Sequence, residues 1–141
     1  MEDDKDFSTL IKCIDYTIKF NELEEGWDSY NSAAINPDAI DKAIYIIIKH
    51  YKKSNILPYF ISPSNNGGVS IEYIYGLDLL SILVDDVRNG VWYTKYYIFV
   101  NMLTKEKESF VREKGTYTFA AFQNFYRKIF RKNAIFYILK D

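Results

Sequence analysis

Two aromatic side chains and a carboxylate lie close together in a segment rich in turn-forming residues, Gly26-Trp27-Asp28-Ser29-Tyr30-Asn31-Ser32. Trp27, Asp28 and Tyr30 could form a recognition patch, because an aromatic pair beside a carboxylate suits a peptide or a nucleic-acid base. The alternative is structural: the two rings fill the end of a helical layer while Asp28 accepts hydrogen bonds from backbone N–H groups, as in Asx turns. The sequence favours the structural alternative and leaves the three residues as a candidate interaction site.

A second candidate site lies near the C-terminus, where four cations follow an aromatic residue: Tyr126, Arg127, Lys128, Arg131 and Lys132. On a helix, this cluster would combine phosphate-binding charge with a ring that can stack on a base. No helix-turn-helix spacing, glycine-rich phosphate loop, zinc-finger pattern or RNP-type strand accompanies it. Pairing with acidic residues of the N-terminal segment, within one chain or between two copies, explains the same charges and is favoured.

The one histidine, His50, lies in a segment with three lysines. Neighbouring ammonium groups disfavour imidazolium, so a general base is conceivable, but no serine or cysteine nucleophile pattern is near it. We therefore expect an exposed histidine without a catalytic role. Cys13 is the one cysteine, and Asp85-Asp86 offers too few oxygens for a hard cation. The sequence predicts no catalytic residue, no metal site and no cofactor.

Charge is unevenly distributed, although eighteen basic and nineteen acidic side chains leave a net charge of -1. Residues 1–41 carry -8, residues 42–104 carry +2 and residues 105–141 carry +5. The small net charge gives no overall attraction to nucleic acid or to an anionic membrane. The acidic and basic ends could pair with each other or face different partners, but solvated helix faces are the expected explanation.

The composition is that of a folded domain, with 48% hydrophobic and 18% aromatic residues in a chain of 141. A domain of this size removes roughly two thirds of its unfolded surface from water, so the core needs no disulfide. The start, MEDDKDFSTL, lacks the features of a signal peptide, and no apolar run approaches the roughly 20 residues of a membrane helix. We expect a cytoplasmic protein with no membrane contact, and the Lys-, Ile-, Asn- and Tyr-rich composition suits a bacterial or phage genome.

Helical spacing of apolar residues predicts three helices. The first spans Asp6 to about Glu24 and is followed by Gly26 in the left-handed conformation. Its expected buried face is Phe7, Leu10, Ile11, Ile14 and Ile18. The second helix begins after Asn36 as N-cap and Pro37 as first residue, and it runs to about Lys53. The third covers 116 to about 132.

A period of two begins after Pro58 and predicts four strands joined by short turns, at residues 59–61, 69–75, 79–84 and 91–100. In the second of these, Val69, Ile71 and Tyr73 should face the helices and Glu72 the opposite side, since a slip of one residue would bury the carboxylate. Residues 105–114 are charged, and a loop with a short strand around Phe110 is one possibility. The predicted fold class is a single α+β domain, residues 1–141. It has an antiparallel four- to five-stranded meander with helices packed on one face, in the order ααββββα, plus an apolar C-terminal segment at 134–139.

Two segments carry a resemblance: the run from Leu23 to Ile35, with Gly26-Trp27-Asp28 at its centre, and Gly67-Gly68-Val69-Ser70-Ile71-Glu72 further on. Together they resemble small, functionally uncharacterised bacterial proteins with a Gly-Trp-Asp-x-Tyr-x-x-Ala loop ahead of a helix and a downstream Gly-Gly-Val-x-Ile-Glu strand. The resemblance covers roughly residues 22–85 and departs from that pattern at Ser29, Asn31 and Tyr73. It implies no particular activity.

The function favoured by these observations is that of a non-catalytic cytoplasmic interaction protein of the adaptor, inhibitor or antitoxin type, with another protein as partner. The alternative is a nucleic-acid-binding module that uses the basic C-terminal helix. A third possibility is an enzyme whose residues are gathered from strand ends, and self-association remains open.

Overall fold

The structure is an α+β arrangement of helices against an antiparallel sheet, which confirms the predicted class. The computed structural model describes residues 2–75, 78–85, 91–100, 107–120 and 122–123. Its elements are α1 (Glu2–Ile18), a 3-10 turn η1 (Lys19–Glu22), α2 (Pro37–Ser54), β1 (Phe60–Pro63), β2 (Val69–Tyr75), β3 (Asp78–Val84), β4 (Val91–Val100) and β5 (Lys107–Thr116). Within the described residues, no helix is long and apolar enough to cross a membrane.

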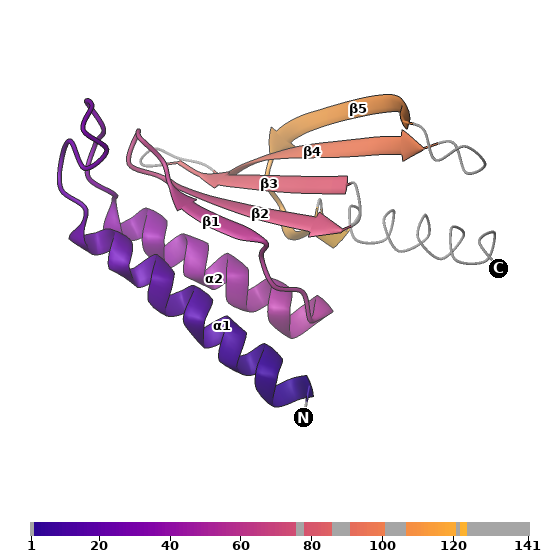
Figure 1. The fold of residues 1–141 in the computed structure, drawn as a ribbon, viewed down its shortest axis with the longest axis horizontal. Coiled ribbons are helices and arrows are strands. Elements are labelled where there is room, and N and C mark those ends of the chain that lie inside the picture. The colour runs from indigo at the N-terminus through magenta and orange to yellow at the C-terminus, as the bar shows by residue number, and fades with distance from the viewer. Residues whose placement is uncertain (1, 76–77, 86–90, 101–106, 121, 124–141) are drawn as a thin grey trace.

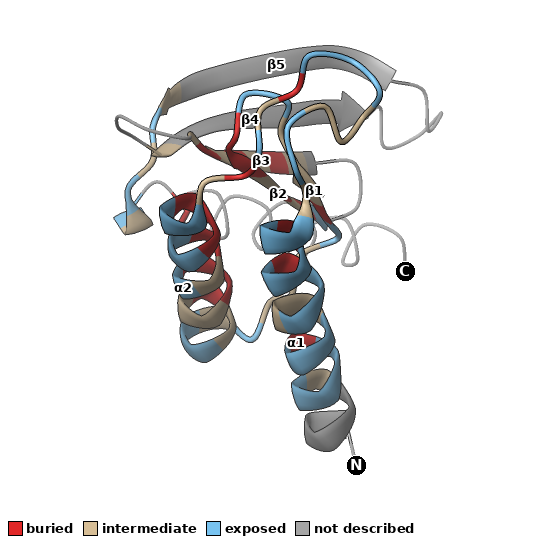
Figure 2. Ribbon diagram, turned by 90° about the vertical axis from the view of Figure 1, so that its left-hand side faces the viewer, coloured by how far each residue is buried: buried red, intermediate tan, exposed pale blue. Residues whose placement is uncertain are grey.

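The strands follow one another across the sheet in chain order, β1-β2-β3-β4-β5, and each pairs antiparallel with its neighbours. Short connections between consecutive strands favour this order, because adjacent elements in the chain pair most readily. Both α1 and α2 run side by side under one face of the sheet (Figures 1 and 2). The β4–β5 pair extends beyond the helices, so the helices cover mainly the β1–β3 part (Figure 1).

The core lies between α2 and the strands β2 and β3. Ile40 and Ile47 of α2, with Ile71 of β2 and Ile82 of β3, have no exposed surface. Ile71 and Ile82 are direct partners in the register of the two strands. These side chains meet because residues spaced by two lie on one face of a strand.

The alternation expected in β2 is confirmed. Val69, Ile71 and Tyr73 are buried on the face of the sheet that packs against the helices, whereas Glu72 is half-buried and Ile74 is 44% exposed. Glu72 pairs with Phe60 of β1, which is 51% exposed. The carboxylate therefore stays in contact with water, on the side of the sheet away from the helices.

The start of α2 is also as predicted. The Asn36 side chain accepts a hydrogen bond of 2.9 Å from the backbone N–H of Asp38, and Pro37 occupies the first turn. The helix ends at Ser54, one residue after the predicted end at Lys53, and Asn55 follows as the C-cap in the left-handed conformation. A side-chain N-cap, a proline at the first position and basic residues in the last turn all favour these boundaries.

The predicted buried face of α1 is partly wrong. Leu10, Thr17 and Phe20 are buried, and Cys13 and Ile14 pack partly against the core. The remaining apolar residues of the predicted face are Phe7, Ile11 and Ile18, which are 56%, 42% and 46% exposed. Apolar residues occupy more than one stripe of this helix, and packing against α2 and β1 buries only the stripe through Leu10 and Thr17.

The end of α1 and the region after β4 also differ from expectation. The α-helix ends at Ile18, and Gly26, with φ of 78°, lies in the following loop rather than at the helix end. Residues 107–116 form a strand of ten residues, longer than the short strand around Phe110 that was one possibility. Charged side chains are compatible with an outer strand, because only its backbone needs to pair. Most of the predicted third helix and the apolar segment 134–139 lie outside the described residues.

Candidate functional site

The loop between α1 and α2 holds the first predicted site. The Trp27 indole N–H donates to the carbonyl of Ala33 at 2.9 Å, and the ring packs against the core. An Asp28 carboxylate oxygen accepts a hydrogen bond of 2.9 Å from the Tyr30 backbone N–H, as an Asx turn would. Tyr30 is 80% exposed. Two of the three residues therefore have structural contacts, and Tyr30 alone presents most of its side chain to solvent.

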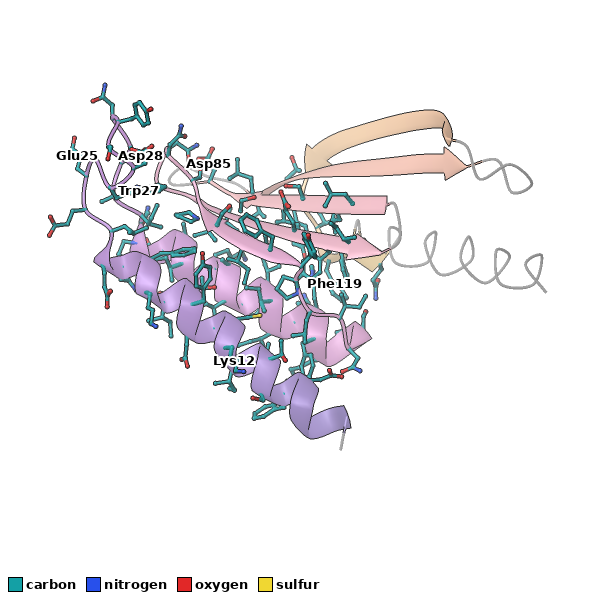
Figure 3. All side chains as sticks on the ribbon, viewed as in Figure 1. Lys12, Glu25, Trp27, Asp28, Asp85 and Phe119 are labelled. Carbon is teal, nitrogen blue, oxygen red and sulfur yellow. The ribbon has the colours of Figure 1, made fainter. Side chains whose placement is uncertain are left out.

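This loop is tied to the turn between β1 and β2. The backbone N–H groups of Ala33 and Asn36 donate to the carbonyls of Asn65 and Gly67, each at 2.9 Å. Asp85 lies at the same end of the molecule as Trp27 and Asp28 (Figure 3) and accepts a 3.2 Å bond from the Asn66 side chain. Among the described residues, no group of three or more His, Cys, Asp and Glu side chains could hold a metal ion. Asp86 lies outside that part of the chain.

His50 is fully buried, so the expectation of an exposed histidine is wrong. The residue continues the buried stripe of α2, three and four positions after Ile47 and Ile46. Its ring stacks on that of Phe122, with 3.6 Å between centroids and 11° between planes. The nearby lysines indicated an exposed position. They are neighbours of the histidine in the chain, but the helical period places position 50 on the buried side of the helix.

The polar contact of His50 is with a residue that follows β5. The Nε2 atom lies 2.6 Å from the hydroxyl oxygen of Tyr117, within hydrogen-bonding distance. Nδ1 of His50 and the hydroxyl of Tyr73 are buried and have no hydrogen-bond partner among the described residues. Residues distant in sequence thus form one aromatic cluster around the imidazole, with Tyr73 and Phe119 at 5.0 and 6.0 Å from it.

Burial sets the protonation states of this cluster. Burial, with a smaller contribution from the nearby Lys49 ammonium, lowers the pKa of His50 to about 3. Burial also raises the pKa of both Tyr73 and Tyr117. All three side chains are neutral at physiological pH, and a histidine with so low a pKa is a poor general base there.

A groove with an aromatic wall runs between α1 and the start of β1. Its volume is about 270 Å³, and its lining residues are Thr9, Lys12, Cys13, Tyr16, Pro58, Tyr59, Phe60 and Ile61. The rings of Tyr16, Tyr59 and Phe60 are 49%, 70% and 51% exposed. Of the described residues that line it, Lys12 is the one that carries a charge, and it lies on the face of α1 visible in Figure 3. Burial raises the pKa of the Cys13 thiol, which therefore stays protonated.

A second hollow, of about 300 Å³, lies between α2 and the residues that follow β5. Lys42, Tyr45 and Lys49 line it from the helix, and Tyr117 and Phe119 from the other side. Figure 3 shows Phe119 to the right of Trp27 and Asp28, near the middle of the view. The spacing of Lys42, Tyr45 and Lys49 places them on one side of α2, but no local pattern connects them to residues 117–119.

The basic cluster predicted near the C-terminus, Tyr126, Arg127, Lys128, Arg131 and Lys132, lies outside the described residues. The chain matches no protein-family model, no curated protein and no solved structure. The resemblance to small bacterial proteins stays a prediction. The groove and the hollow are therefore the geometric basis for functional proposals.

Proposed function

We propose that this protein is an interaction protein that binds a segment of a partner protein in the groove between α1 and β1. The observation that carries the proposal is a groove whose lining includes two exposed aromatic residues, Tyr16 and Tyr59, and the neighbouring Phe60 of β1. Aromatic side chains are enriched at protein interfaces, where they bury a large area at little cost in conformational entropy. They also dominate the residues that contribute most to binding energy.

The proposed occupant is an extended peptide segment. Among the described strands, β1 pairs only with β2, so the other edge of β1 offers backbone donors and acceptors. An extended peptide can pair with such an edge and place alternate side chains into neighbouring pockets. The edge is short, because β1 has four residues and ends at Pro63, which has no N–H to donate. A segment of a few residues therefore fits best.

Charge refines the chemistry of the partner. Lys12 is the one charged residue among the described residues that line the groove, so an acidic side chain in the partner segment would complement it. The expected segment combines apolar or aromatic residues with one acidic residue. A binding role, of the adaptor, inhibitor or antitoxin type, also agrees with the poor basicity of the buried His50 at neutral pH.

Quantitative co-purification from the cells that naturally make the protein tests this proposal. The groove variant carries Tyr59→Ser and Phe60→Ser, and the control carries Tyr30→Ser, which removes an aromatic ring that is 80% exposed in another loop. A protein partner should be recovered with the wild type and the control but not with the groove variant. Thermal melts of all three should coincide, because none of these rings is buried.

Two outcomes would count against the proposal. Equal recovery of every partner with the groove variant would show that the groove is not the binding surface. Recovery of nucleic acid that falls steeply with salt would instead favour the module that uses Arg127, Lys128, Arg131 and Lys132.

A further inference from the structure

The hollow beside α2 brings two ammonium groups to a single aromatic ring. The Nζ atoms of Lys42 and Lys49 lie 5.3 and 5.8 Å from the centroid of the Tyr45 ring. Lys49 Nζ is also 4.5 Å from the Phe119 centroid. Cation–π contacts of this kind hold ammonium groups in place. The two like charges nevertheless repel each other, and the described residues that line the hollow include no acid to neutralise them.

A hydroxyl group completes the set of donors. Tyr117 lines the same hollow and shares a hydrogen bond of 2.6 Å with His50 Nε2. The neutral imidazole carries one proton, and Nδ1 is buried without a partner among the described residues. Buried N–H groups without an acceptor are rarer than acceptors without a donor, which favours the proton on Nε2. His50 then donates to Tyr117, whose own hydroxyl proton is left to donate to another acceptor.

From this geometry we propose that the hollow binds a small oxyanion, a phosphate or carboxylate group, between Lys42, Lys49 and the Tyr117 hydroxyl. Ammonium and phenol groups supply donors, and the described residues of the lining offer the anion no competing carboxylate. Charge-assisted hydrogen bonds to such a group are roughly twice as strong as neutral ones. A space of about 300 Å³ is at the small end for ligand sites, so the ligand is a small molecule.

This site is separate from the groove proposed to bind a protein segment. Its residues lie on α2 and after β5, whereas the groove is formed by α1 and the start of β1. Failure of the groove variant to lose its protein partner would not affect the oxyanion proposal. Failure of anion binding in the hollow would likewise not affect the proposal of a protein-binding groove. Each proposal therefore has its own test.

The test is a titration of the isotope-labelled protein with inorganic phosphate, and separately with benzoate, followed by NMR at constant ionic strength. The amide signals of Lys42, Lys49 and Tyr117 should shift and saturate with a Kd of about 1 mM. The two titrations distinguish the ligand classes, because the tighter one identifies the phosphate or the carboxylate as the preferred group.

Matched variants assign the effect to the site. Lys42→Gln with Lys49→Gln should raise the Kd at least about tenfold, since each loses a charge-assisted contact. Lys5→Gln with Lys19→Gln removes the same charge from α1 and the 3-10 turn that follows it, away from both the groove and the hollow, and should leave the Kd within about twofold. Tyr117→Phe should raise it about fivefold, through loss of one neutral donor. The amide spectrum of each variant verifies its fold.

The proposal is overturned if neither anion shifts these signals at concentrations of about 10 mM, or if the two double variants weaken binding equally. The second result would mean that the anion responds to net charge and not to the hollow.

Discussion

The two helices, α1 and α2, differ in what packs against them. α2 packs on β2 and β3, and Tyr117, Phe119 and Phe122 pack around its histidine, which is fully buried. α1 lies beside the short edge strand β1 and keeps Phe7, Ile11 and Ile18 exposed. The comparison teaches that apolar content alone does not bury a helix. The element that packs over each stripe determines which side chains leave water.

The same difference separates the two candidate sites. The groove beside α1 is aromatic and carries one charge, which suits association with a peptide. The hollow beside α2 carries two ammonium groups and adjoins the buried neutral cluster around His50, and these features suit a small anion. We therefore expect α2 to contribute mainly to stability and α1 mainly to association with a protein partner.

The largest expected effect is from a matched pair of isoleucine truncations. Ile47→Ala on α2 should lower the free energy of unfolding by about 4 kcal/mol, because the side chain is fully buried and its removal leaves a cavity. Ile11→Ala on α1 should cost less than about 1 kcal/mol, because that side chain is 42% exposed. Denaturant melts measure both, and equal losses would contradict the division of roles between the helices.

Trp27→Ala should have the next largest effect, about 3 kcal/mol, because it removes a large ring packed on the core and the hydrogen bond to Ala33. Trp27→Phe keeps most of the apolar area and should recover more than half of that loss. Denaturant melts are again the measurement. A normal melt for Trp27→Ala together with lost partner binding would show that Trp27 serves recognition and not the packing of the loop.

Acid should destabilise the protein through His50. The pKa of this histidine is about 3 in the folded protein and about 6.5 when unfolded, so the unfolded state alone binds a proton between these values. The stabilising effect is therefore complete above pH 6.5 and is lost as pH falls, by up to about 1.4 kcal/mol per pH unit.

The matched control for acid sensitivity is His50→Gln, which keeps a neutral donor near Tyr117 but has no proton to gain. Unfolding free energies measured from pH 7 to pH 5 should slope for the wild type and be nearly flat for the variant. Parallel slopes would show that His50 is accessible to protonation in the folded state.

The smallest stability effect is expected in the groove. Tyr59→Ser and Phe60→Ser should each change the free energy of unfolding by less than about 0.5 kcal/mol, because both rings are more than half exposed. Ile61→Ser, at the adjacent buried position, should cost several times more. Melts of the three variants test whether the exposed rings are free to serve binding.

The sequence predicted most of what depends on local patterns. The N-cap of α2 and the alternation along β2 follow from residue types at fixed spacing, and both are as expected. The buried stripe of α1 depends on which neighbours pack against it, so several apolar stripes were equally compatible with the sequence. The burial of His50 depends on Tyr117 and Phe122, which are 67 and 72 positions away and carry no local signal.

The candidate sites show the same limit. Trp27, Asp28 and Tyr30 are neighbours in the chain, and their grouping was visible from the sequence. The groove joins Tyr16 of α1 to Tyr59 and Phe60, and the hollow joins Lys42 and Lys49 to residues after β5. Both surfaces form only when folding brings segments that are distant in the sequence next to the helices.

The most direct test of the central claim is site-specific photocrosslinking in the cells that make the protein. A photoreactive amino acid replaces Tyr59 in one variant and Tyr30 in the control, both exposed aromatic positions. We expect a discrete adduct with one partner protein at position 59 and none at position 30. No adduct at position 59, or the same adducts at both positions, would contradict a protein-binding groove between α1 and β1.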